Sequence, residues 1–187
     1  MQVIQFNKNS FQKYKNQLVD LYLHAFTTGN YAQFIERKDA ELGLDSLSQH
    51  GDGFIAILDK TIIGIIIGTP LSFDENFPSG LLPEIDKKSC VYIAELMIVS
   101  NMRGKGIAQK LIDIYFNKKI KEQFSDVVIR VWNENIPALL LYKKLGFIEI
   151  AEITQTKMKS QHESFEMKKL YLHKYLSNDD RFNYKNN

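Results

Sequence analysis

The stretch CVYIAELMIVSNMRGKGIA, from Cys90 to Ala108, predicts a buried strand that turns directly into a helix. Its first half, Cys90 to Val99, is apolar on both alternating faces, which is typical of a central strand covered on two sides. Its second half opens a helix whose first N–H groups have no intrahelical partner. Gly104 and Gly106 keep Cβ atoms out of the way, and Arg103 and Lys105 add positive charge, so the turn predicts an anion site.

The residues that follow continue the same unit. The new helix extends to about Lys119, and Val127–Trp132 reads as a further strand. A strand, a helix and another strand form a right-handed parallel crossover. Asn135 then caps a third helix, which ends at Gly146.

Three kinds of phosphate ligand compete for this turn. A Walker loop is excluded because the chain has no Gly-x-x-x-x-Gly-Lys-Ser/Thr sequence. A dinucleotide fingerprint begins well, but its third glycine position holds Gln109 and its ribose-binding position holds Trp132. The pyrophosphate of CoA is the ligand for which the match extends furthest.

Two motifs carry that match. Arg103, Gly106 and Ala108 follow an apolar strand, and a second motif comprises Asn135, Ala138, Tyr142 and the pair Gly146-Phe147. Over residues 53 to 172 the chain resembles the GNAT superfamily of acyl-CoA-dependent N-acetyltransferases. The usual proline of the turn is replaced by Ser100, which affects the stiffness of the turn more than its chemistry.

The resemblance implies a fold and a cofactor site. The fold is a single-domain α/β (α+β) structure with a central mixed, mostly antiparallel twisted sheet of about seven strands, flanked by about four helices. The cofactor is acetyl-CoA. Its pantetheine arm pairs with the backbone of Met97, Ile98 and Val99, and Asn135 binds its amides beside the small Ala138. The residues implied to hold the pyrophosphate are Arg103, Gly104, Lys105, Gly106, Ile107 and Ala108.

Acetyl transfer to an amine requires a proton acceptor and a donor for the leaving thiolate. Tyr142 lies two helical turns after Asn135 on the same helix face, and the resemblance makes it the acid. Glu95 is the only acid within the apolar strand; it is a candidate base, and a structural salt bridge is an equal alternative. Simple alternation places it with Ile93 and Met97, although a bulge would shift this register.

Other candidates for the chemistry are weaker. His24, Glu36 and His162 are read as surface or satisfied polar residues. Cys90 is the single cysteine, without an ordered His/Asp partner or metal-ligand spacing, and is expected to be a buried small residue; no metal site is predicted.

The rest of the chain supplies further elements. We expect helices over Phe11–Phe26, capped by Ser10, and over 31–42, and a hairpin of strands 54–58 and 61–68. A long loop over 69–89 and strands over 147–153 and 165–172 follow. We expect one domain over 1–176 and a polar, frayed tail over 177–187.

Composition limits the partners and the location. The net charge of +2 gives no nucleic-acid footprint, and the longest apolar run is too short to span a membrane. The beginning of the sequence lacks the apolar core of a signal peptide, so a reducing cytoplasm is expected. The C-terminal strands could pair across a homodimer.

The acceptor is expected to be a primary amine of a small molecule or peptide, bound by the first two helices, the long loop and the last strands. Four loop acids suit a cationic acceptor, although a solvated loop explains them equally well: Asp74, Glu75, Glu84 and Asp86. Two rival functions stay open. One is a CoA-binding sensor without turnover, and the other is a nucleotide-dependent oxidoreductase.

Overall fold

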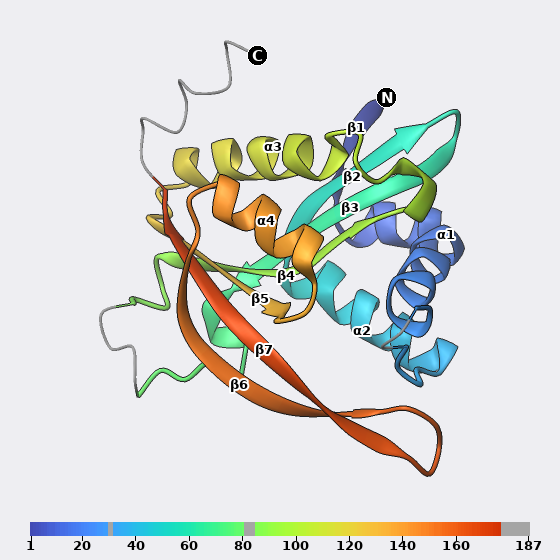
Figure 1. Ribbon diagram of the computed structural model, residues 1–187. Helices are drawn as coiled ribbons and strands as arrows, with labels where there is room; N and C mark the ends of the chain where they lie inside the picture. Colours follow the sequence, from blue (N-terminus) through green and yellow to red (C-terminus); the bar gives the residue numbers. More distant parts are fainter. Residues whose placement is uncertain (30–31, 81–84, 177–187) are drawn as a thin grey trace.

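The strand expected at the centre of the sheet, β4 (Cys90–Ile98), lies fourth in a sheet of seven strands (Figure 1). The computed structural model describes residues 1–29, 32–80 and 85–176, and counts of elements refer to these residues. The other strands are β1 (Gln2–Phe6), β2 (Asp52–Leu58), β3 (Thr61–Pro70), β5 (Asp126–Trp132), β6 (Ile148–Met158) and β7 (Ser164–Tyr175). The helices are α1 (Lys8–Thr27), α2 (Arg37–His50), α3 (Ile107–Lys121) and α4 (Ile136–Lys144).

The sheet has the order β1-β2-β3-β4-β5-β7-β6. β4 and β5 are parallel and joined by α3, whereas all the other neighbouring pairs in the described residues are antiparallel. Such a parallel pair needs a crossover connection, and α3 provides it. The predicted mixed, mostly antiparallel sheet with four helices is therefore confirmed.

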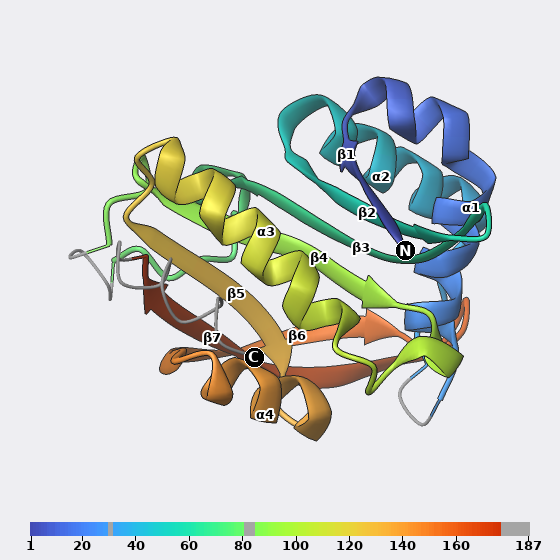
Figure 2. The ribbon, with the colours of Figure 1, turned by 90° about the horizontal axis from the view of Figure 1, so that it is seen from above.

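Helices cover both faces of the sheet. α3 and α4 pack on one face, where Leu111 and Tyr115 are fully buried against β2 to β5. α1 and α2 pack on the other face, where Leu18 and Leu44 bury themselves against β2 and β3 (Figure 2). Because β4 is covered on both sides, the continuous apolar character of its sequence follows from its position.

A bulge in β4 changes which side chains share a face. Ile67 of β3 pairs with Glu95, but the next residue, Gly68, pairs with Ile93, so Ala94 is an extra residue on β4. As a result Ile93 packs into the α3 core and Met97 into the α1 core. Glu95 therefore shares a face with Met97, as simple alternation predicts, but not with Ile93, because the bulge shifts the register between them.

All three elements before β2 differ from the sequence prediction. β1 was not expected, and it forms because its backbone pairs with β2 along the sheet edge. α1 begins three residues earlier, since Asn7 is the N-cap and Ser10 completes the capping box from inside the helix. α2 begins and ends later than 31–42 because Ala40, Leu44 and Ser48 continue its buried stripe past Gly43.

The last two strands are longer than predicted and form a twisted hairpin that reaches the α1 and α2 side of the molecule (Figure 1). At the end of β6, the Met158 carbonyl accepts a hydrogen bond of 2.7 Å from the Phe34 N–H, between α1 and α2. The hairpin therefore borders the region between α1, α2 and β4. The expected tail over 177–187 lies outside the described residues.

The loop after β3 is anchored by its own apolar residues. Leu71, Phe77 and Ile85 are buried in a third cluster with Val128 and Tyr171 of the sheet. The described parts of the 69–89 segment thus cover the sheet face beside α1 and α2, over β4, β5 and β7.

Candidate active site

The turn between β4 and α3 has the backbone that an anion site requires. Gly104 and Gly106 both have positive φ, of 73° and 76°. Gly106 is the N-cap of α3 and makes no side-chain capping bond, and the first intrahelical bond joins the Lys110 N–H to its carbonyl at 3.0 Å. The earlier N–H groups of α3 therefore open toward solvent, where the helix dipole favours negative charge. A diphosphate fits this turn.

Two exposed cations flank the same turn. Arg103 donates from Nε to the Ile98 carbonyl at 3.2 Å, and the Lys105 ammonium lies 3.6 Å from the Met102 sulfur. Both side chains have weak local partners, so both can turn toward a phosphate.

Before the turn, along the second half of β4, the strands β4 and β5 separate. Their pairing runs from Cys90 and Asp126 to Ile93 and Ile129 and ends there. On the other side of β4, the Val99 N–H donates to the Ile63 carbonyl of β3 at 3.0 Å. Backbone groups alternate along an antiparallel strand, so Met97 and Val99 face β3 and Ile98 faces the opening.

α4 brings two predicted residues to the opposite lip of this opening. Asn135 is the N-cap, and its Oδ1 accepts from the Ala138 N–H at 3.4 Å, which leaves its side-chain NH₂ to donate elsewhere. Tyr142 is 5% exposed, with its ring edge-on to Phe147 at 5.6 Å. Its hydroxyl makes no hydrogen bond among the described residues. Burial, with a smaller contribution from Glu95, raises the Tyr142 pKa, so the phenol stays protonated.

Glu95 lies on the other face of β4, at a cavity of about 300 Å³ between α1, α2 and β4. Its carboxylate is partly buried, and no cation lies within 4 Å of it in the described residues, so the alternative of a structural salt bridge is not formed. Burial raises the Glu95 pKa to about 8, and Lys169 and Arg130 oppose the shift from a distance. A carboxylate with this pKa can take up a proton near neutral pH.

Glu95 and Tyr142 belong to opposite faces of the sheet, yet they influence each other. The carboxylate raises the pKa of the phenol through its charge. Paired strands would keep the two faces apart, but the strands are not paired beyond Ile93. The opening between β4 and β5 therefore connects a candidate base on one face with a candidate acid on the other.

Sequence reasoning missed several residues around Glu95. Tyr22 of α1 and Tyr92 line the same cavity, and burial raises the pKa of both phenols. The charges of Lys169 on β7 and Arg130 on β5 lower the pKa of Glu95. Arg130 is the only charged residue of the apolar stretch 127–132, and this was the signal that could have identified it.

One of the loop acids that suit a cationic acceptor, Asp74, is already paired inside the fold. Asp74 is buried and accepts hydrogen bonds from Arg130 at 2.9 Å and from the Tyr171 hydroxyl at 2.8 Å. Its charge is thus already compensated inside the fold. Glu75 and Asp86 are exposed, and Glu84 lies outside the described residues.

The weaker candidates have ordinary surroundings. Cys90 is fully buried as expected, and burial raises its pKa, which makes the thiol unreactive. Glu36 and His162 are exposed, and the His24 ring contacts the Ser100 hydroxyl at 3.3 Å.

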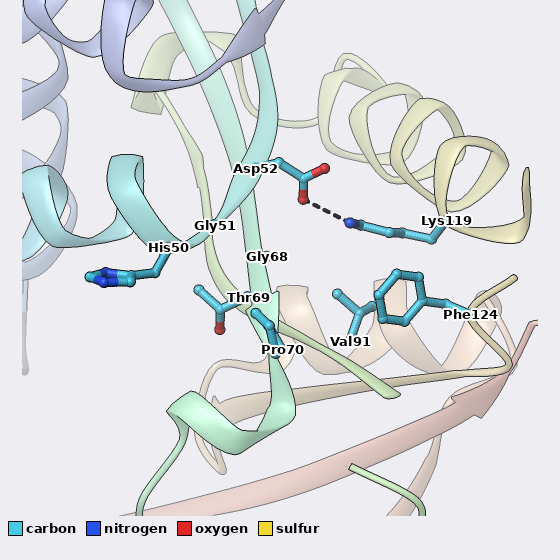
Figure 3. Close-up of a pocket in the computed structure, with 9 residues that line it drawn as sticks. All are labelled: His50, Gly51, Asp52, Gly68, Thr69, Pro70, Val91, Lys119 and Phe124. Carbon is cyan, nitrogen blue, oxygen red and sulfur yellow. Dashed lines mark ion pairs between the residues drawn. The ribbon is translucent and has the colours of Figure 1, made fainter. Parts of the chain in front are cut away.

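A second cavity, of about 230 Å³, lies at the C-terminal end of β3 and is lined by His50, Thr69, Lys119 and Phe124 among others (Figure 3); His50 and Thr69 also line the cavity at Glu95. Its charges are paired internally, because the Lys119 ammonium lies 2.9 Å from Asp52 and 3.1 Å from Glu122. This cavity does not include Glu95 or the anion turn.

Neither a metal-binding cluster nor a membrane-spanning helix occurs among the described residues. No group of three or more His, Cys, Asp or Glu side chains is placed to hold a metal ion there. Within the same residues, no helix has the length and apolar character needed to cross a membrane.

These features agree with the comparison to known families. The model of the Acetyltransferase (GNAT) family matches residues 15–147, so the chain belongs to this family and carries its acetyltransferase domain, which uses acetyl-CoA. The curated N-alpha-acetyltransferase 30 of Saccharomyces cerevisiae is 34% identical over 52% of this chain. An N-alpha-acetyltransferase of Saccharolobus solfataricus is 26% identical over 57%. The chain spans 52% and 63% of the lengths of these two relatives.

Solved structures share the fold. The ribosomal-protein-alanine N-acetyltransferase of Brucella melitensis superposes with a TM-score of 0.68 at 14% identity, over 94% of this chain and 100% of that one. The yncA protein of Salmonella typhimurium, solved with its cofactor acetyl-CoA, gives a TM-score of 0.66 at 14% identity, over 95% of this chain and 94% of that one.

Proposed function

We propose that this chain transfers the acetyl group of acetyl-CoA to a primary amine of a small molecule or peptide, by direct attack in a ternary complex, with residues 1–176 as the N-acetyltransferase domain. The observation that carries this proposal is the opening between β4 and β5 beyond Ile93, which lies beside the uncapped start of α3. Such an opening admits an extended ligand whose phosphates rest on the helix N-terminus.

Acetyl-CoA supplies the activated acetyl group as a thioester. The N–H groups from Gly104 to Ala108 hold its pyrophosphate, with Arg103 and Lys105 nearby. The backbone of Ile98, between Met97 and Val99, pairs with the pantetheine arm as an added half-strand. On the other lip the Asn135 NH₂ donates to it, and the small Ala138 leaves room.

The proton steps fall to two side chains. Glu95, with its raised pKa, takes the proton from the amine nitrogen, directly or through water. The Ile98 N–H donates a hydrogen bond to the thioester carbonyl oxygen and stabilises charge there. Tyr142, kept protonated by burial, gives its proton to the departing sulfur.

Peptide α-amines are the first acceptors to test, because two relatives carry the name N-alpha-acetyltransferase. Because those relatives match only part of this chain at low identity, small-molecule amines are tested as acceptors as well. We retain a cytoplasmic location and a homodimer through the C-terminal strands as predictions.

The test is release of CoA thiol from acetyl-CoA, measured with a panel of peptide and small-molecule amines. We expect amine-dependent release by the wild type, and a large decrease in Tyr142→Phe with acetyl-CoA still bound. Lys144→Ala, an exposed position on the same helix, is the matched control and should retain the activity. Tight binding of acetyl-CoA without release for any amine would instead identify a CoA-binding regulatory module.

A further inference from the structure

The sheet face that carries Glu95 also carries a group of cations. Trp132 and Ile153 pair with Lys169 from either side, and Arg130 pairs with Tyr171. Cross-strand partners point to the same face, so Lys169 and Arg130 project on the side of Tyr171, below the α1 and α2 layer. Lys157 lies four residues after Ile153 on β6, and alternation gives it the same face.

These cations differ in how far their charge is compensated. Arg130 forms an ion pair with the buried Asp74. Lys157 and Lys169, by contrast, have no carboxylate within 4 Å among the residues that the structure describes, although both side chains are partly buried. Burial, with a smaller contribution from the charge of Arg130, lowers the pKa of both amines; Lys157 lowers that of Lys169 further, to about 8. Two half-buried amines therefore lie on the Glu95 face of the sheet with no carboxylate within 4 Å in the described residues.

Lys168, the neighbour of Lys169, does have an ion-pair partner. Lys168 points to the opposite face of β7 and pairs with Glu152 at 3.0 Å in an exposed position. Other lysines near the core are paired as well, for example Lys119 with Asp52. The two lysines without an ion-pair partner in the described residues, Lys157 and Lys169, are thus among the charges that lower the pKa of Glu95, the candidate base of the proposed acyl-transfer site.

Lys157 and Lys169 lie on the β6–β7 hairpin, which reaches the side of the molecule where we expect the acceptor. Lys157 immediately precedes Met158, whose carbonyl accepts from the Phe34 N–H between α1 and α2. In Figure 1 the β6–β7 hairpin curves below β4 toward these helices. An acceptor that extends from Glu95 toward the β6–β7 hairpin would lie along the face that carries Lys157 and Lys169.

We propose that Lys157 and Lys169 form an anion subsite that selects amine acceptors carrying a carboxylate near the amine. This assignment rests on the proposed acetyl transfer and names the substrate class of that site. The expected charge of the acceptor is thus opposite to that suggested by the loop acids, because the Asp74 carboxylate is already paired with Arg130. A carboxylate between the two ammonium groups supplies the missing counter-ion and forms charge-assisted hydrogen bonds.

The experiment compares three peptides that differ only at the first residue, which is Glu, Gln or Lys, and pairs each free amino acid with its amide. We expect kcat/KM for the Glu peptide to exceed that for the Gln peptide by about tenfold or more, with the Lys peptide lowest. In Lys169→Met and Lys157→Met this ratio falls toward one, whereas Lys168→Met retains it. Equal kcat/KM values for Glu and Gln peptides in the wild type overturn the proposal.

A binding measurement separates this proposal from the proposed function. With CoA present, calorimetry should show tighter binding of the N-acetylated Glu peptide than of its Gln counterpart, and Lys169→Met should remove the difference. That result supports the subsite even if no amine is turned over, in which case the catalytic proposal alone fails. Amine turnover with no charge preference in either assay overturns the subsite and leaves the catalytic proposal standing.

Discussion

The substitution Glu95→Gln should stabilise the protein, and increasingly so as the pH rises. The folded state holds the Glu95 pKa at about 8, compared with an ordinary value of 4.5. Between these values the folded protein binds more protons than the unfolded chain, so the stability of the wild type falls with rising pH. One pKa unit corresponds to about 1.4 kcal/mol, which gives a total of roughly 3–5 kcal/mol by pH 8.

The surroundings of Glu95 set both the sign and the size of this effect. Burial disfavours the carboxylate, while Lys169, Arg130 and Lys157 favour it from a distance. Tyr22 and Tyr142 are neutral phenols in this range, because burial raises the pKa of each. The net penalty therefore falls on the ionised carboxylate, and glutamine removes it.

The assay is urea unfolding of the wild type and Glu95→Gln at several pH values between 5 and 9. We expect the difference in unfolding free energy to grow by about 1.4 kcal/mol per pH unit up to pH 8 and then to level off. Glu75→Gln, at an exposed position, is the matched control. A difference that stays constant with pH would refute the reasoning, since it would mean that Glu95 ionises normally in the fold.

Three further predictions follow from the same geometry. Gly106→Ala should raise the KM for acetyl-CoA about tenfold and, because Gly106 has positive φ, lower the stability by about 1 kcal/mol. Gly43→Ala, in the interior of α2, should instead stabilise the protein by up to ~1 kcal/mol. Saturation kinetics measure the KM, and thermal unfolding measures the stability of both variants. Tyr142→Phe should lower kcat about 10²-fold with little change in the KM for acetyl-CoA, and an unchanged kcat under chemistry-limited conditions would exclude the acid role. Asp74→Ala should destabilise by about 3 kcal/mol because Arg130 loses its buried partner, and urea unfolding that shows less than ~1 kcal/mol would contradict this.

Much of the donor side could be predicted from the sequence because it depends on local rules. The turn at Gly104 and Gly106 requires positive φ, the cap at Asn135 satisfies its own helix, and the apolar run of β4 reflects burial on both faces. Each of these features follows from residues close together in the chain. The family motifs then extended the match from one turn to the whole fold.

The acceptor side could not be predicted because it depends on pairing between distant segments. The bulge at Ala94, which fixes the face of Glu95, appears only in the register of β3 against β4. The fate of Asp74 depends on Arg130 and Tyr171, which follow it by 56 and 97 residues. Lys169 reads as one lysine among many until the sheet order places it on the face of Glu95.

Isotope-labelled acetyl-CoA gives the most direct test of the central claim, that the opening between β4 and β5 is an acetyl-transfer site. The purified chain is incubated with labelled acetyl-CoA and a peptide bearing a free α-amine, and the products are identified and quantified by mass spectrometry. We predict labelled N-acetyl peptide and free CoA in equal amounts, both strongly reduced in Tyr142→Phe. Acetyl-CoA that binds the protein but remains intact with every amine would contradict the claim.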